Sequence, residues 1–187
     1  NFYKTLKDRN KMAKKIHPLL LTRGVPGTHE LRLVKIFFRK IKKKNFIKFK
    51  LPKFNKALDN RDKKKNWIMI KKKPEIVIFE GWCIGARPQS NYLIKKPVNI
   101  LEKNEDKNFT WRKYVNGKLK KEYKNFFSII DDLIFIKIPN FKMVFKWRLL
   151  QENKLRKKVY FKKKIMSYHE IKKFIMFYER ITLQMVK

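Results

Sequence analysis

Glu75-Ile76-Val77-Ile78-Phe79-Glu80-Gly81 is the stretch that decides the fold. Between its two acids it is an unbroken run of β-branched and aromatic residues, and the glycine ends it abruptly. Such a run is typical of a central strand in a parallel sheet, where both faces are buried. A second run of this kind, residues 133–138, is closed by Pro139. Both are therefore predicted to be strands of one parallel sheet.

Stretches with helical spacing of apolar residues flank these two strands. They cover residues 2–16, 30–43, 141–158 and 168–185. The last of them follows a capping box, in which Ser167 and Glu170 stand three residues apart. Strands that alternate with helices predict an α/β fold, a parallel sheet flanked by helices, and the length fits a single domain over 1–187. Residues 46–54 alternate apolar and basic side chains and predict a half-exposed strand.

The net charge of +36, from 51 basic and 15 acidic residues, is extreme. Taken alone it favours a nucleic-acid-binding or ribosomal-type structural protein, because such a surface attracts phosphate backbones. Most of these basic residues are Lys, and Asn, Ile and Phe are also abundant, which is equally consistent with a drift in composition. The two interpretations predict different surfaces: a binder concentrates Lys on one face, whereas drift spreads it over all solvent-exposed faces.

Apolar stretches and cysteines limit the possible locations. No stretch approaches the roughly 20 apolar residues that a membrane span needs, so no membrane contact is expected. Cys83 is the single cysteine, so an internal disulfide is excluded and a reducing compartment, the cytoplasm, is expected.

Polar residues at the strand ends and in one glycine-rich loop are the candidates for chemistry. Glu80 lies where a strand ends, and ligands of open parallel sheets bind beyond such ends. An acid there can hold the water shell of Mg²⁺ or orient a nucleophile, or it can simply face solvent. Residues 22–30 contain two glycines and a proline, which indicates a shaped loop that carries Arg23 and His29.

Arginine is scarce in this lysine-rich chain, so each remaining arginine is a candidate for a role that needs its planar, bidentate group. The candidates, which lie where Lys is least frequent or beside Gly, Pro or Trp, are Arg23, Arg61, Arg87, Arg112, Arg148 and Arg180. For each of them a structural salt bridge is an equally reasonable interpretation, and a single His such as His29 is also often a structural hydrogen-bonding residue.

Two motifs resemble the D-glycerate 3-kinase family. Thr22-Arg23-Gly24-Val25-Pro26-Gly27-Thr28-His29-Glu30 is similar to the family's loop, which usually reads Arg-Gly-x-Pro-Gly-Thr-His-Asp. Ile78-Phe79-Glu80-Gly81-Trp82 resembles its Glu-Gly-Trp strand end. Further matches follow the family's order, so that the resemblance covers essentially the whole chain: 56–61, 97–102, 111–116, 147–152 and 178–182.

The resemblance implies a P-loop kinase fold related to uridine kinase and phosphoribulokinase. It implies transfer of the γ-phosphoryl group of ATP to the 3-hydroxyl of D-glycerate. Glu80 would be the catalytic acid of the Walker B type, and it would lie near Mg²⁺. Arg23 and His29 would bind glycerate, with Arg61 and Arg87 as further anion contacts. Arg148 would be the lid arginine on the transferring phosphate. A related kinase that acts on another small hydroxy acid or sugar would share these features, so this alternative interpretation remains.

The chain departs from the family at its start. No Gly-x-x-x-x-Gly-Lys-Ser/Thr loop is present; Gly117-Lys118 is followed by Leu119. Asn1 stands at the second acid of the family's Asp-Asp-Phe-Tyr, and the first acid, the expected base for the substrate hydroxyl, would precede it. We therefore expect a P-loop kinase domain that lacks its N-terminal P-loop strand, with weak or no ATP turnover by these 187 residues alone.

Overall fold

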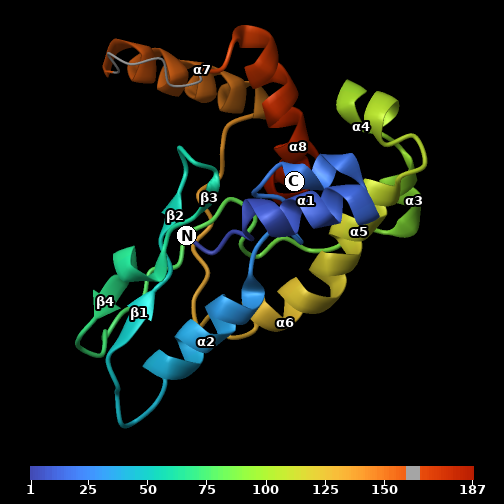
Figure 1. Cartoon of the computed structure of the whole chain (residues 1–187). Coiled ribbons are helices and arrows are strands. Elements are labelled where there is room, and N and C mark those ends of the chain that lie inside the picture. The colour runs from blue at the N-terminus through green and yellow to red at the C-terminus, as the bar shows by residue number, and fades with distance from the viewer. Residues whose placement is uncertain (159–164) are drawn as a thin grey trace.

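The computed structural model describes residues 1–158 and 165–187 (Figure 1). Most of its regular structure is helical. The α-helices are α1 (Leu6–Lys15), α2 (Leu31–Ile41), α3 (Asn91–Lys95), α4 (Ile100–Glu105), α5 (Thr110–Lys118), α6 (Lys124–Phe127), α7 (Phe141–Lys158) and α8 (Tyr168–Val186). Two 3₁₀ turns, η1 (Pro18–Leu21) and η2 (Lys64–Asn66), and one π-helical turn, η3 (Leu119–Tyr123), complete the helical elements.

Two small antiparallel sheets lie beside the helices. Their strands are β1 (Phe49–Leu51), β2 (Phe54–Asn55), β3 (Asn60–Arg61) and β4 (Ile68–Ile70). β1 pairs with β4 so that Phe49 is opposite Ile70, and β2 pairs with β3 so that Phe54 is opposite Arg61. The single strand predicted over 46–54 is thus shorter and is followed by a break, because Pro52 cannot donate a ladder hydrogen bond.

The predicted parallel sheet is not observed among the described residues. Residues 75–79 and 133–138 form no strand, although the first run alternates as a strand does. Ile76 and Ile78 are 81% and 89% exposed, whereas Val77 and Phe79 face the core. In the second run, Ile134 and Ile136 are each 87% exposed. The reason is physical: a strand exists only through hydrogen bonds to a neighbouring strand, and none lies beside either run.

The helices follow the sequence pattern closely. α2 and α7 occupy the ranges predicted from the spacing of their apolar residues to within a few residues at each end. α8 begins at the predicted capping box, where the Ser167 side chain accepts from the Glu170 backbone N–H and the Glu170 side chain accepts from the Ser167 backbone N–H. These signals are local in sequence, so they do not depend on a missing partner.

The core forms where the 22–30 loop meets α2, α5, η3, α6 and α8. Its members come from these elements and their neighbours, and several are almost fully buried: Leu20, Val25, Val34, Leu101, Leu119 and Phe126. Phe79 joins it through ring contacts to Phe2, Phe38 and Phe126. Both chain termini lie in this central part of the molecule, while α7 projects at one end and the β hairpins at another (Figure 1).

A buried network of charges ties α8 to α4 and α5. Arg180 donates to both carboxylate oxygens of Glu102, at 2.8 and 2.6 Å, and also to the Lys96 carbonyl. Arg112 pairs with Asp106 at 2.8 Å and lies 3.9 Å from Glu102. Because each of these charges has partners, their burial is tolerated, and the network fixes how the helices pack.

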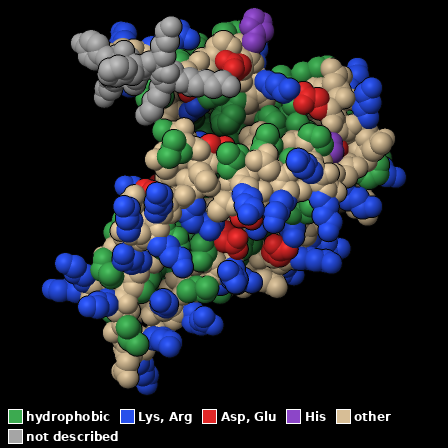
Figure 2. Space-filling view, in the orientation of Figure 1, with side chains coloured by type: hydrophobic (Ala, Val, Ile, Leu, Met, Phe, Trp, Pro, Cys, Tyr) green, Lys and Arg blue, Asp and Glu red, His purple; other side chains and the backbone are tan. Residues whose placement is uncertain are grey.

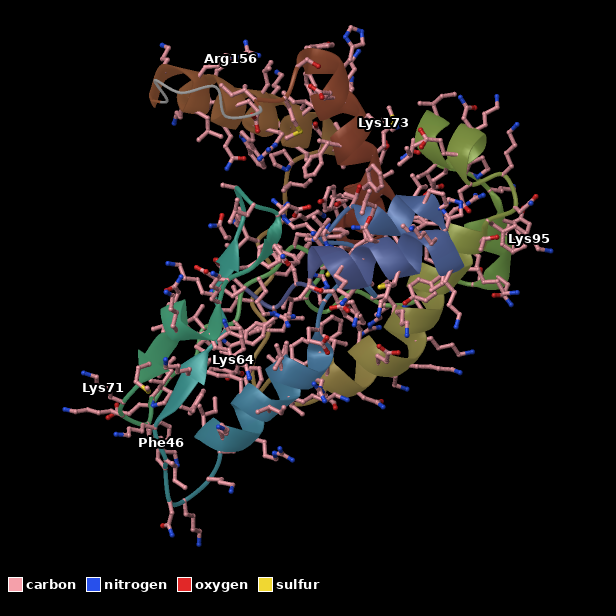
Figure 3. The ribbon with its side chains drawn as sticks, viewed as in Figure 1. Phe46, Lys64, Lys71, Lys95, Arg156 and Lys173 are labelled. Carbon is pink, nitrogen blue, oxygen red and sulfur yellow. The ribbon has the colours of Figure 1, made fainter. Side chains whose placement is uncertain are left out.

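Basic side chains are spread over the face of the molecule that Figure 2 shows. Lys and Arg side chains project there from the small sheets and from the helices alike. Lys71, Lys95 and Arg156 lie at the periphery on three separate parts of the chain (Figure 3). This distribution matches the compositional interpretation of the charge better than a dedicated nucleic-acid surface.

Candidate functional site: the 22–30 loop

The loop at residues 22–30 is shaped by its glycines and by one threonine. Gly24 and Gly27 have φ of +108° and +99°, a region that side chains disfavour. The Thr28 hydroxyl accepts from the Gly24 N–H at 2.8 Å and donates to the Val25 carbonyl at 2.7 Å. The hydroxyl thus bridges the turn internally, and residues 24–28 are all buried. The sequence prediction of a shaped loop is confirmed.

Three aromatic side chains from distant elements hold this loop from outside. Tyr178 of α8 donates to the Arg23 carbonyl at 3.0 Å, and Trp82 donates to the Gly24 carbonyl at 2.8 Å. The hydroxyl of Tyr123, in η3, accepts from the Gly27 N–H at 2.9 Å. The loop backbone is therefore fixed on several sides, and Arg23 and His29 at its two ends keep part of their surface exposed.

Arg23 lies between an acid and two aromatic rings. Its guanidinium forms an ion pair with Asp59 and lies 5.9 Å from the ring centre of Tyr3 and 5.7 Å from that of Phe54. Asp59 has a left-handed backbone, φ 49°, and also pairs with the buried Arg9 at 2.9 Å. Arg23 is still 30% exposed, so an anion can reach it.

His29 is joined to the same group of residues. Its Nδ1 lies 2.6 Å from the Tyr123 hydroxyl, and its ring centre lies 5.2 Å from that of Tyr3. Burial lowers the pKa of His29 to about 4, and the nearby positive charge of Lys4 acts in the same direction. His29 is therefore neutral near pH 7 and keeps part of its surface open to solvent.

The depressed pKa of His29 predicts a loss of stability in mild acid. The unfolded chain titrates near 6.5 and the folded one near 4, so the unfolded state binds more protons between these values. We expect the free energy of unfolding to fall by up to about 2 kcal/mol between pH 7 and pH 5. Urea unfolding of wild type and His29→Gln at both pH values measures this, and the variant should show the smaller fall.

A matched control is His169→Gln, since His169 is exposed on α8. It should show the same fall as wild type. A fall of equal size in His29→Gln would contradict the assignment of the pH dependence to His29.

Glu80 lies near the start of the chain. Burial and the charge of Lys56 lower the pKa of the Asn1 amino group, and the charge of Glu80 opposes them. The same amino group acts on the pKa of His29, so both side chains lie near Asn1. Glu80 is exposed, and within residues 1–158 and 165–187 it forms no hydrogen bond or ion pair. Its carboxylate is therefore available to a ligand.

The other predicted arginines divide into three positions. Arg61, in β3, donates to the Tyr3 carbonyl at 2.9 Å and so supports the residue that packs on His29. Arg148, in α7, pairs with Glu152 and lies over the ring of Phe174. Its charge, like that of Arg23, acts against the burial that raises the pKa of Tyr178, so both arginines lie near that tyrosine.

Arg87 is placed apart from the loop. It is exposed and lines a cavity of about 230 Å³ with apolar residues and the amide of Gln184. None of the residues that line this cavity belongs to the 22–30 loop: Ile84, Gly85, Arg87, Leu133, Phe135, Gln184 and Met185. The site thus unites Arg23, His29 and Arg61 around Tyr3, brings Glu80 to Asn1, and leaves Arg87 outside.

Few protein side chains are available to bind a metal ion at this site. Among the described residues there is no cluster of three or more His, Cys, Asp or Glu side chains that could hold a metal ion. Mg²⁺ bound with a nucleotide needs only one or two carboxylates besides the phosphates, so the free carboxylate of Glu80 fits such an ion.

None of the helices in the described part of the chain is long and apolar enough to cross a membrane.

Comparison with proteins of known sequence and structure gives consistent matches. The chloroplastic D-glycerate 3-kinase of Arabidopsis thaliana is 28% identical over 164 residues, which are 83% of this chain. A D-glycerate 3-kinase structure from Cryptococcus neoformans superposes on 95% of the chain with a TM-score of 0.77 and 26% identity. This chain resembles the D-glycerate 3-kinases. The resemblance expected from the two motifs is therefore confirmed.

Two further proteins extend the comparison. An uncharacterized kinase of Schizosaccharomyces pombe, mug58, is 27% identical over 186 residues, 95% of this chain. The structure of the YGR205w protein matches 95% of the chain with a TM-score of 0.68 and 28% identity. No family model matches. The chain spans 65% of mug58 and 34% of the Arabidopsis enzyme, and 64% and 61% of the two solved structures.

Sequence reasoning missed the residues that organise the loop. Tyr123 and Asp59 bond to loop residues 94 and 36 positions away, and no spacing rule connects them. The placement of Tyr123 in a π-helical turn is also invisible in the apolar pattern. Tyr3 was within reach, because it belongs to the Asn1-Phe2-Tyr3 segment that matches the motif Asp-Asp-Phe-Tyr of the D-glycerate 3-kinases.

Proposed function

We propose that this chain forms the larger part of an ATP-dependent kinase that transfers the γ-phosphoryl group to the 3-hydroxyl of D-glycerate. The proposal is supported chiefly by the fixed loop that carries Arg23 and His29, together with Glu80, which lies near Asn1. Two proteins named D-glycerate 3-kinase match most of this chain in sequence or in structure. The nucleic-acid-binding alternative gains no support from any of the matches.

The substrate is proposed to bind through its carboxylate to Arg23. A guanidinium holds a carboxylate with two parallel hydrogen bonds, and the Arg23 side chain is partly exposed. The neutral ring of His29 contributes a hydrogen bond to a hydroxyl or carboxylate oxygen. Arg61 adds positive charge and supports Tyr3, while Arg87 is a more distant candidate anion contact.

Phosphoryl transfer needs positioning and positive charge more than covalent chemistry. The substrate hydroxyl oxygen bonds to the γ-phosphorus, the bond from that phosphorus to the β–γ bridging oxygen breaks, and ADP leaves. The hydroxyl proton goes to a carboxylate, for which the resemblance implies an acid before Asn1. Glu80 would hold Mg²⁺, which when bound neutralises charge on the phosphates. Arg148 would exchange Glu152 for the transferring phosphate.

The fold proposed for the whole protein is a single domain with a parallel sheet. Residues 75–79 and 133–138 would be two of its strands. The alternation at 76–79 and the exposed isoleucines of both runs support this, since a neighbouring strand and its helices would cover them.

The cytoplasm is the location that we propose for the protein. Cys83 is buried, and burial raises the pKa of its thiol to about 12, which suits a reducing compartment.

The test uses the protein together with the upstream segment that the resemblance implies. ATP-dependent formation of 3-phosphoglycerate from D-glycerate is expected, and Arg23→Ala should raise KM for D-glycerate by about 10- to 100-fold, the worth of a charge-assisted hydrogen bond. Arg32→Ala is the matched control, because Arg32 is exposed on α2, just after the loop. No phosphorylation by wild type, or equal effects of both variants, would contradict the proposal.

A further inference from the structure

The hydroxyl of Tyr123 makes two hydrogen bonds to the 22–30 loop. It accepts from the Gly27 N–H at 2.9 Å, and it lies 2.6 Å from His29 Nδ1. Tyr123 itself is 2% exposed, so water does not substitute for either partner. The two bonds connect the backbone conformation of the loop to the side chain of His29.

Counting protons decides the direction of the second bond. A tyrosine hydroxyl has a single proton to donate and can accept through its oxygen. Among the described residues, His29 Nδ1 is the one acceptor within reach of that proton. If Nδ1 carried the ring proton instead, the buried O–H of Tyr123 would be left without a partner, which is costly. Nδ1 is therefore the acceptor, and the ring proton is on Nε2.

The titration behaviour of both groups agrees with this arrangement. Burial raises the pKa of Tyr123 well above its usual value of 10, so the hydroxyl keeps its proton. Burial also lowers the pKa of His29 to about 4, so the imidazole is neutral and has only one N–H. The pair therefore exists as Tyr–OH and neutral imidazole near pH 7.

A change in helix type brings Tyr123 to this position. It is the last residue of η3, the π-helical turn between α5 and α6, and its ring packs edge-on against His29. A π-helical turn holds one more residue per turn than an α-helix, which re-aims the side chains after it, and such turns are frequent at functional sites.

We propose that Tyr123 is a positioning residue that holds His29 in the Nε2–H tautomer, so that Nε2–H donates a hydrogen bond to an oxygen of the hydroxy-acid substrate. A neutral donor of fixed direction favours an oxygen lone pair and cannot accept a proton from the hydroxyl that reacts. The identity of the substrate rests on the proposed function, whereas the tautomer stands on the geometry of Tyr123 and His29 alone.

The tautomer is measured by long-range ¹H–¹⁵N NMR of the ¹⁵N-labelled protein at pH 7, with His29→Gln to assign the signals. We expect an unprotonated Nδ1 and a protonated Nε2 for His29 in wild type. Tyr123→Phe keeps the ring and removes the hydroxyl, so it should give a mixture of tautomers. Tyr114→Phe is the matched control, because Tyr114 packs against Gly27 and forms no hydrogen bond with His29.

A protonated Nδ1 in wild type would overturn the proposal, and this spectrum decides even if Tyr123→Phe does not fold. An unchanged tautomer in folded Tyr123→Phe would overturn it too. In the protein with its upstream segment, Tyr123→Phe should raise KM for D-glycerate and leave KM for ATP unchanged; equal changes in both would speak against positioning. Failure of wild type to phosphorylate D-glycerate would refute the proposed function, while the tautomer is read without substrate.

Discussion

Replacing Glu80 by Gln in the protein with its upstream segment is expected to lower kcat by about 100- to 1000-fold, the usual effect of removing one preorganised charged or polar contact to the transition state. Gln keeps the size of the side chain and removes its charge. Because Glu80 is exposed and has no ion pair or hydrogen bond within the described residues, the loss cannot come from a broken structural contact. The fall should therefore appear in kcat with little change in thermal stability.

Glu75→Gln is the matched control for this experiment. Glu75 is also exposed and begins the same run of residues, at the end that points away from Glu80. Its replacement should leave kcat within about twofold of wild type, as surface substitutions usually do. A Glu80→Gln enzyme with wild-type kcat at all Mg²⁺ concentrations would remove Glu80 from the proposed site.

Arg180→Met is expected to destabilise the fold by about 3–5 kcal/mol, because it leaves the carboxylate of Glu102 buried without its main partner. The second partner, Arg112, lies 3.9 Å away and cannot replace the two short bonds. Urea unfolding at pH 7, followed by circular dichroism, measures the change in the free energy of unfolding.

The chain offers a close control on the same two helices. Lys173 of α8 pairs with Glu105 of α4 at 2.6 Å, but both are exposed, and Lys173 reaches across the surface toward α4 (Figure 3). Such a pair contributes about 0–1 kcal/mol, so Lys173→Met should change stability by no more than that. Similar losses in the free energy of unfolding from both substitutions would show that the buried network contributes no more to stability than an exposed ion pair.

What the sequence could predict depends on how local each signal is. α7 and the capping box of α8 were predictable because side chains three or four residues apart determine a helix and its start. The runs 75–79 and 133–138 have the composition of strands, yet they are not strands here, because pairing needs another segment. Composition therefore indicated what these runs can become, not what they form on their own.

The site divides in the same way. Arg23, His29 and Glu80 were found from unusual residue types in a glycine-rich loop and at the end of an apolar run. Tyr123 was not, because its role arises from a hydrogen bond that spans 94 residues and from a helical turn of unusual type. Tertiary packing brings together the residues that position the side chains of a site, and the spacing of residues along the sequence does not reveal that packing.

In the proposed site, Asp59 occupies the position at Arg23 that a substrate carboxylate would take. Its left-handed backbone and its pair with Arg9 hold a carboxylate against Arg23 before any ligand arrives. In the proposed site an incoming acid exchanges places with Asp59, and its advantage is the second parallel hydrogen bond that a substrate carboxylate forms with Arg23, where Asp59 forms one. A neutral molecule cannot replace the negative charge of Asp59 beside Arg23, so the proposed site selects anions.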